Sequence, residues 1–257
     1  MTKAALNKKT IIKPRWKTLM SGKVLFAVVF TVVVFSLLVK LGLWQLERGY
    51  DKQQIESTLA QRAEMPPVAL EHTLSISNPT GFRVNVEGRA VAEHYVLLDN
   101  QTWQGKVGYL AYQVIEAQDR YWLVERGFVA APPSREVLPQ VDWLRGEVKF
   151  VGRVYRRSLN PLSSQLSPEF IAPYRIQNLN LGQLSRLFDL PIEANLVQPQ
   201  VSQWPYPMPW NPLPLPSRKH FGYAVQWFAM ASVLFGLVAW CCWRAIRLSS
   251  TATKEAK

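Results

Sequence analysis

The chain has 257 residues, enough for one domain of ordinary size plus membrane segments, with a net charge of +12 at pH 7 and two cysteines. Most of the net charge comes from the first 23 residues and from the tail after residue 243, both of which lie beside apolar segments, and this argues against the basic folded face of a nucleic-acid-binding protein. Cys241 and Cys242 are adjacent within an apolar stretch, which argues against a disulfide framework and a cysteine metal site.

The first predicted elements are a basic cytoplasmic tail, residues 1–23, and a membrane helix, residues 24–44. As a helix the second segment would be about 31 Å long, which matches the ~30 Å hydrocarbon core of a bilayer. A cleaved signal peptide would have a shorter apolar core, and a mitochondrial presequence would favour arginine over the lysine found here. We therefore expect an uncleaved anchor in a bacterial inner membrane.

Residues 45–222 are predicted to form a periplasmic, β-rich domain. The polar segment 47–63 has helical spacing and extends the first membrane helix until Pro66 stops it. Five strand-like runs follow, separated by turn residues, at 82–87, 95–98, 108–115, 121–129 and 147–154. A short helix is predicted at 181–188. The fold class is thus two transmembrane helices flanking a mostly antiparallel β domain, α+β overall, with a small barrel as one arrangement.

The domain is predicted to end in a proline-rich segment, residues 204–216, which favours an extended backbone. It is either a stiff spacer leading down to the membrane or a docking segment for a partner. The second membrane helix is predicted at 223–243, followed by a cytoplasmic tail, 244–257. The positive-inside rule places the N-terminal tail in the cytoplasm, and two spans then bring the C-terminus to the same side. The lipid bilayer is the first expected partner.

No motif of an enzyme is evident: the sequence has no glycine-rich phosphate loop, no nucleophile elbow and no covalent haem attachment motif. His72 and His94 are isolated and fit surface or strand-end positions. His220, three residues before the second span, is a candidate axial ligand for haem iron. Trp227 lies two helical turns further on and would share its face. Both residue types are also ordinary at a membrane interface, and this second interpretation stays open.

Two segments resemble the signatures of the surfeit-locus family of cytochrome c oxidase assembly factors. Gly42-Leu43-Trp44-Gln45-Leu46-Glu47-Arg48 is similar to the signature that ends the first span of that family. The segment from His220 to Phe228 is similar to the signature at the start of the second span. The chain departs from the family in having Arg218 and Lys219 before the histidine and Phe128 where a tryptophan is frequent.

The resemblance implies a membrane assembly factor for cytochrome c oxidase rather than an enzyme. It implies that the protein binds haem a transiently through His220, beside Trp227, and passes it to the catalytic subunit of the oxidase. The partners would be that subunit and the haem a synthesis machinery. A scaffold without a cofactor is the alternative, and a tethered hydrolase a weaker third. For Trp44, Gln45 and Arg48, helix packing or interfacial anchoring is favoured over cofactor contact.

Overall fold

The computed structural model describes residues 22–157, 164–169, 173–210 and 212–254. The chain divides into a helix unit, which holds the residues up to Gln53 and from Leu215, and a β unit, Gln54–Pro214. Most of the predicted N-terminal tail and the last three residues of the C-terminal tail lie outside the described residues.

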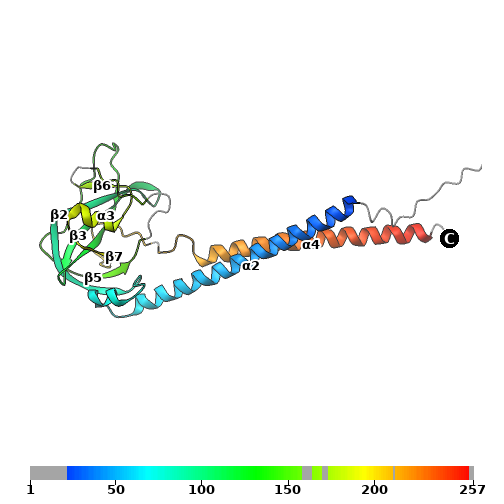
Figure 1. The fold of residues 1–257 in the computed structure, drawn as a ribbon, viewed down its shortest axis with the longest axis horizontal. Helices are drawn as coiled ribbons and strands as arrows, with labels where there is room; N and C mark the ends of the chain where they lie inside the picture. Colours follow the sequence, from blue (N-terminus) through cyan, green and yellow to red (C-terminus); the bar gives the residue numbers. More distant parts are fainter. Residues whose placement is uncertain (1–21, 158–163, 170–172, 211, 255–257) are drawn as a thin grey trace, which may run out of the picture. The chain divides into compact units, whose positions relative to one another are not determined.

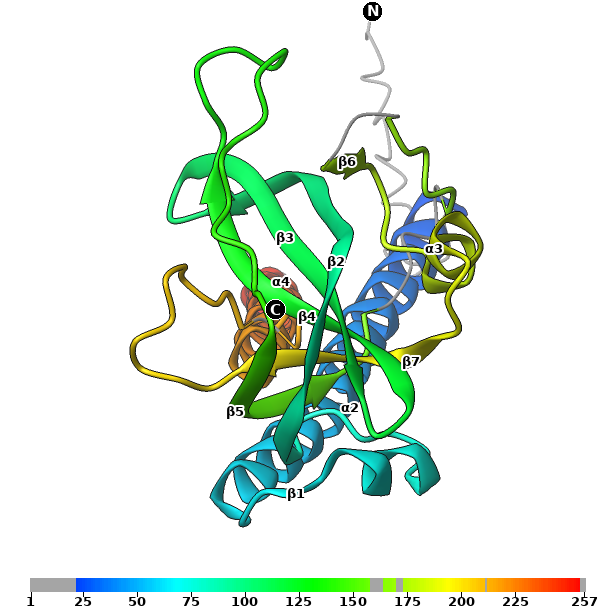
Figure 2. The ribbon, with the colours of Figure 1, turned by 90° about the vertical axis from the view of Figure 1, so that its left-hand side faces the viewer.

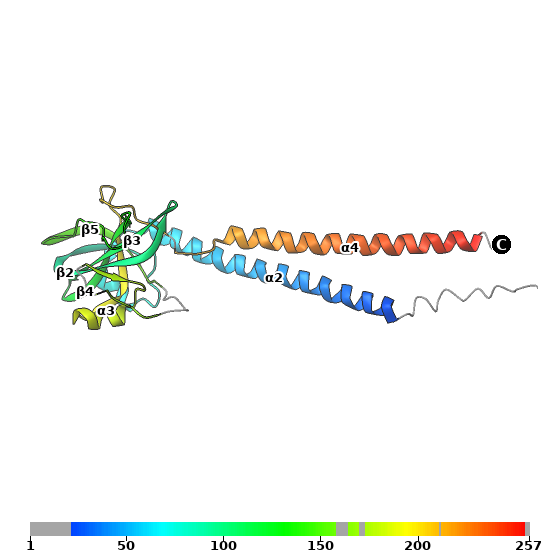
Figure 3. The same cartoon turned by 90° about the horizontal axis from the view of Figure 1, so that it is seen from above.

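Two long helices form the helix unit, where they lie side by side (Figures 1 and 3). α2 runs over Gly22–Glu64 and α4 over Ser217–Lys254. Both are long and apolar enough to cross a membrane, which confirms the two predicted apolar helices. α2 continues through the predicted extension and ends just before Met65-Pro66, because proline at this point cannot continue the backbone hydrogen-bond pattern.

The β unit combines seven strands with two short helical segments in the described residues (Figure 2). In chain order these are β1 (Val68–Ala69), the 3-10 helix η1 (Leu70–Ser75), β2 (Arg83–Trp103), β3 (Lys106–Ala117), β4 (Arg120–Ala130), β5 (Glu147–Tyr155), β6 (Tyr174–Ile176), α3 (Leu181–Phe188) and β7 (Ile192–Pro199). Apart from Phe82, the five predicted strand segments fall on β2, β3, β4 and β5.

The strand pairings form a circuit within the described residues. β2 pairs with β3, β3 with β4, β4 with β7, β7 with β5, and β5 again with β2. The long strand β2 closes this circuit because Arg83–Arg89 pairs with β5 and the part from Arg89 to Trp103 pairs with β3. β4–β7, β1–β2 and β2–β6 are parallel, so the sheet is mixed. Despite the circuit of pairings, the described strands do not form a clear barrel. The predicted α+β class is confirmed.

The predicted short helix is α3, Leu181–Phe188, with the expected bounds. The side chain of Asn180 accepts a hydrogen bond from the backbone N–H of Gln183, which caps the first turn. Asp189 has φ 52°, the left-handed conformation that commonly ends a helix. The side chain of Leu184 is fully buried and joins the helix to the core.

The central strands are buried on both faces. In β4, Leu123 belongs to one apolar cluster, and its neighbours Trp122 and Val124 belong to another. Since successive side chains of a strand point to opposite faces, the two clusters lie on opposite sides of β4. The first cluster includes Leu184 of α3. β4 is therefore an interior strand. Its charged residues Glu125 and Arg126 are buried with it.

The proline-rich segment packs along β4. The indole Nε1–H of Trp204 donates to the carbonyl oxygen of Arg126 at 2.8 Å, and the amide of Phe128 donates to the carbonyl oxygen of Pro207 at 2.9 Å. Gly127 between them has φ +116°, and a Cβ there would lie 2.7 Å from the Pro207 oxygen. Glycine is needed at this position because the segment approaches the strand so closely. The segment thus contacts its own domain as well as linking it to α4.

Candidate functional site

Two glycines of α2 allow a close approach of α4. A Cβ on Gly42 would lie 2.7 Å from Cε1 of Phe228, and one on Gly49 would lie 2.5 Å from Cε1 of Phe221. The two glycines are seven residues apart, as are the two phenylalanines, and they meet in opposite order. The helices are therefore antiparallel, and each aromatic ring sits on a glycine at heptad spacing. This packing fixes the register of the residues between the two contacts.

His220 lies at this level of the helix pair. Its Nδ1 is 2.8 Å from Oε1 of Gln45 on α2. An amide oxygen accepts hydrogen bonds, so Nδ1 is the donor in this contact, and in the neutral imidazole Nε2 then keeps its lone pair. His220 is 8% exposed, and its Nε2 is buried without a hydrogen-bond partner in the described residues. A neutral imidazole in this tautomer can bind a metal through Nε2. In this structure the surrounding side chains cover Nε2.

α4 begins at Ser217, so His220 and Trp227 belong to the same helix. Their spacing of seven residues puts them about 10 Å apart along the same face. Trp227 is half-buried, whereas Arg218 and Lys219 are exposed beside the histidine. The face thus combines one imidazole, one indole and, next to them, two cations. This is a suitable set for a flat apolar ligand with acidic groups.

The three signature residues of α2 are placed differently from one another. Gln45 contacts His220, whereas the side chain of Trp44 is 48% exposed on the outer surface of the helix pair. Arg48 is also exposed and forms an ion pair with Asp51, with 3.5 Å between the charged atoms. The structure brings only Gln45 to the histidine.

No group of three or more His, Cys, Asp or Glu residues that could hold a metal ion occurs within the described part of the chain. His72 is exposed, and Nδ1 of His94 lies 2.6 Å from the carbonyl oxygen of Ala92. Cys241 and Cys242 are free and exposed on α4. Within the described residues, His220 is therefore not part of a cluster of three such metal-ligand residues.

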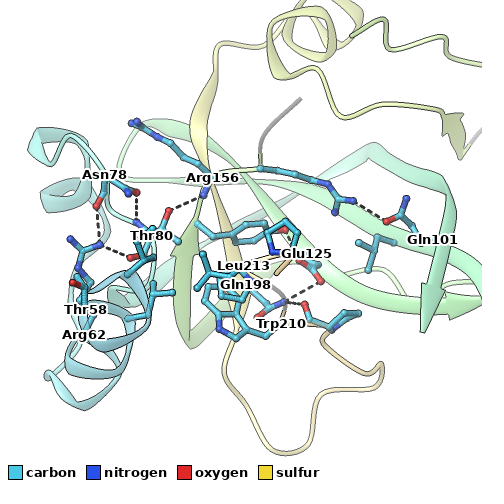
Figure 4. Close-up of a pocket in the computed structure, with 18 of the residues that line it drawn as sticks. Thr58, Arg62, Asn78, Thr80, Gln101, Glu125, Arg156, Gln198, Trp210 and Leu213 are labelled. Atoms are coloured by element: carbon cyan, nitrogen blue, oxygen red, sulfur yellow. Dashed lines mark hydrogen bonds between the residues drawn. The ribbon is translucent and has the colours of Figure 1, made fainter. Parts of the chain in front are cut away.

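A second polar site lies in the β unit around Glu125 of β4. Glu125 is 2% exposed and accepts hydrogen bonds from the hydroxyl of Tyr155 and from Nε2 of Gln198, the latter at 3.2 Å. The hydroxyls of Tyr155 and Tyr112 are 3.3 Å apart, and Nη1 of Arg157 donates to the Tyr112 hydroxyl at 3.1 Å. Figure 4 shows Glu125 and Gln198 side by side.

Burial dominates the ionisation of this network. Burial raises the pKa of Glu125, although the hydrogen bonds from Tyr155 and Gln198 and the charges of Arg157 and Arg153 act in the opposite direction. Burial likewise raises the pKa of Tyr112 to about 12, helped by the charge of Glu125. Burial lowers the pKa of Arg153 to about 10, so it remains a cation at neutral pH. The network thus holds a carboxyl whose charged form is disfavoured.

The sequence does contain a signal for this network. Glu125 and Arg126 interrupt a strand that is otherwise apolar, and both are buried. Charged residues are almost never fully buried unless they have partners, so such a pair in an interior strand indicates a polar network.

Comparison with protein-family models matches residues 32–232 to a model described as the SURF1 family. The matched region includes both helix segments that meet at His220 and the whole β unit. A comparison with curated proteins gives no match.

Proposed function

The chain belongs to the SURF1 family, the surfeit-locus family associated with cytochrome c oxidase assembly, and on this premise we propose that it carries haem a during that assembly. Haem a would bind transiently at His220 and pass to the catalytic subunit of the oxidase. The protein would receive it from the haem a synthesis machinery. Its place would be a bacterial inner membrane, with both termini in the cytoplasm and the β unit in the periplasm.

The state of the His220 imidazole carries this proposal. The hydrogen bond to Gln45 holds the proton on Nδ1, which leaves Nε2 as the donor atom for iron. Nε2 has no other partner in the described residues, so a metal would not have to displace a hydrogen bond there. Trp227 offers an indole along the same face, and Arg218 and Lys219 offer exposed cations for acidic ring substituents.

Haem, when bound, would supply an iron that takes an imidazole ligand, and His220, oriented by Gln45, would supply that imidazole. Because Nε2 is covered, the packing around His220 must open before iron can reach it. A ligand atom that becomes covered again after release favours transient over permanent binding. That is the property expected of a carrier.

The test is the haem content of the full-length protein, purified in mild detergent from a host that makes haem a. We expect the wild type to carry haem a and His220→Ala to lose it, as read from the reduced absorption spectrum and the extracted haem. His94→Ala, a histidine of the β unit, is the matched control and should keep haem. Haem retained by His220→Ala would place the ligand elsewhere.

Substitutions of Gln45 can distinguish two roles of His220, a ligand of haem iron and an ordinary interfacial histidine. We expect Gln45→Leu to weaken haem binding by about 10- to 100-fold, the usual cost of losing the partner that orients a metal-bound histidine. Gln45→Glu keeps an acceptor for Nδ1 and makes the imidazole more basic, so it should keep haem and lower the reduction potential. Equal haem affinity and potential in all three proteins would contradict an axial role for His220.

A scaffold without a cofactor is the second candidate function. The observation that favours it is the packing itself, since contacts with Gln45 and the two ring-on-glycine pairs already account for a buried histidine. Folded wild-type protein that contains no haem, from a host with haem a available, would favour this scaffold over the carrier.

A further inference from the structure

The β unit contains a pocket with a volume of about 830 Å³. The last turns of α2, the inner residues of the sheet and the proline-rich segment form its walls, as Figure 4 shows for ten labelled residues. Its volume is in the range of pockets that hold one small organic molecule. All of its lining residues belong to Gln54–Pro214, so it is separate from the site at His220.

The polar part of the lining is cationic. Arg62, Arg156 and Arg157 line the pocket together with a single carboxyl group, that of Glu125. All three arginines donate to neutral acceptors. Arg62 bonds the carbonyl oxygens of Asn78 and Thr80, and Arg157 bonds the Tyr112 hydroxyl and the Gln101 amide oxygen. Guanidinium groups whose acceptors are neutral are ready to bind an anion, because a carboxylate or phosphate gives a stronger, charge-assisted bond.

Another part of the lining is apolar. Trp210 and Leu213 of the proline-rich segment face the pocket, with Leu110 and Phe128 from the sheet. The Trp210 ring is held by the guanidinium of Arg153, 3.2 Å from the ring centroid, and by the edge of Tyr155. An indole fixed in this way forms a rigid wall for the flat or apolar body of a ligand.

From these two halves we propose that the pocket binds one amphipathic organic anion. Its acidic group lies against Arg157, and its apolar body lies against Trp210 and Leu213. The buried Glu125 and Gln198 form a polar floor that can hydrogen-bond a neutral polar substituent. In sequence, the part of α2 that lines the pocket follows the apolar part of the same helix, and the proline-rich segment is followed by the apolar helix α4. A molecule from the membrane is therefore the natural source.

Two membrane molecules have this chemistry: an anionic phospholipid and a tetrapyrrole with carboxylate side chains. Native mass spectrometry of the full-length protein in detergent can count either as a bound species. The probes are short-chain phosphatidylglycerol and metal-free protoporphyrin, with short-chain phosphatidylcholine as the zwitterionic control. We expect one of the two anions to bind in a 1:1 complex and the zwitterion to bind at least about tenfold more weakly.

The variants are Arg157→Ala and Trp210→Leu, and the matched control is Arg120→Ala, an arginine paired with Glu193 away from the pocket. Arg157 is exposed, so its loss should leave the fold intact, which a melting curve would check. We expect either pocket variant to weaken binding of the anion about tenfold or more, and Arg120→Ala to leave it unchanged. Binding of phosphatidylglycerol alone would identify a lipid site, and binding of protoporphyrin alone a tetrapyrrole site.

Absence of a 1:1 complex with both anions would overturn the proposal, as would equal binding in wild type and both pocket variants. Equal binding of phosphatidylcholine would also overturn it, because the arginines would then confer no selectivity. Binding here requires neither iron nor His220, so His220→Ala should bind both probes as the wild type does. The result is therefore independent of whether His220 ligates haem.

Discussion

Replacing Gly49 by leucine is expected to push the two long helices apart at the level of His220. The Cβ alone would lie 2.5 Å from Cε1 of Phe221, and leucine adds three further carbon atoms in the same direction. Overpacking a tight contact costs about 1–3 kcal/mol, and a helix pair whose backbones are in close contact has little room to repack. Because Gln45 is one helical turn away, we expect its hydrogen bond to His220 to be lost as well.

The distance between spin labels at the exposed positions Leu43 and Tyr223 would measure this separation, after both native cysteines are replaced by serine. We expect a longer and broader distance distribution in Gly49→Leu and a lower melting temperature. Gly222→Leu on α4 is the control, since nothing lies within 4 Å of a Cβ there. Adding Phe221→Ala should restore part of the native distance. An unchanged distance in Gly49→Leu would contradict the ring-on-glycine packing.

Local patterns predicted most of the secondary structure. The apolar helices follow from uninterrupted apolar residues, and α3 follows from leucines at helical spacing before Pro191. The two predicted pieces of β2 are one strand because a bulge joins them. The register with β3 shifts between Ala90 and Tyr95, and Glu93 has φ 62°. A bulge breaks the alternation of side chains without ending the strand, so periodicity alone cannot bridge it.

β7 could not be predicted because its polar residues point inward. Asn195 and Gln198 are 2% and 1% exposed, and Asn195 accepts a hydrogen bond from Nε of Arg156. Their side-chain partners Arg156, Arg153 and Glu125 are 39, 45 and 73 residues away in sequence. Buried amides destroy the apolar periodicity that identifies a strand, and only the tertiary fold shows that they are satisfied.

A long separation in sequence also limited the prediction of side-chain contacts in the helix unit. His220 could be selected from its position before an apolar segment, and its signature matched a family. Its partner could not be assigned, because Gln45 is 175 residues away and the contact depends on how the two helices cross. Once the glycine and phenylalanine contacts fix that register, the tautomer of His220 follows from the chemistry of the amide.

Glu125→Gln is expected to make the stability of the protein less sensitive to pH. Burial raises the pKa of Glu125 in the folded state, so between its ordinary value near 4.5 and its raised value the folded protein binds more protons than the unfolded chain. Stability therefore decreases as the pH rises through this window, since the charge develops in a buried site. Glutamine resembles the protonated acid, because it can donate to Tyr155 while it accepts from Gln198, and it avoids this loss.

The measurement is the melting temperature of both full-length proteins between pH 5 and pH 8. We expect the melting temperature of Glu125→Gln, relative to wild type, to rise by several degrees as the pH increases. Glu193→Gln is the control, because Glu193 pairs with Arg120 and lies outside the network around Glu125. We expect no comparable rise for this variant. A constant difference for Glu125→Gln would contradict titration of Glu125 in this range. A difference in melting temperature that rises with pH would show that the fold favours the neutral form of the Glu125 carboxyl. A neutral carboxyl at the floor of the pocket can donate a hydrogen bond to a ligand.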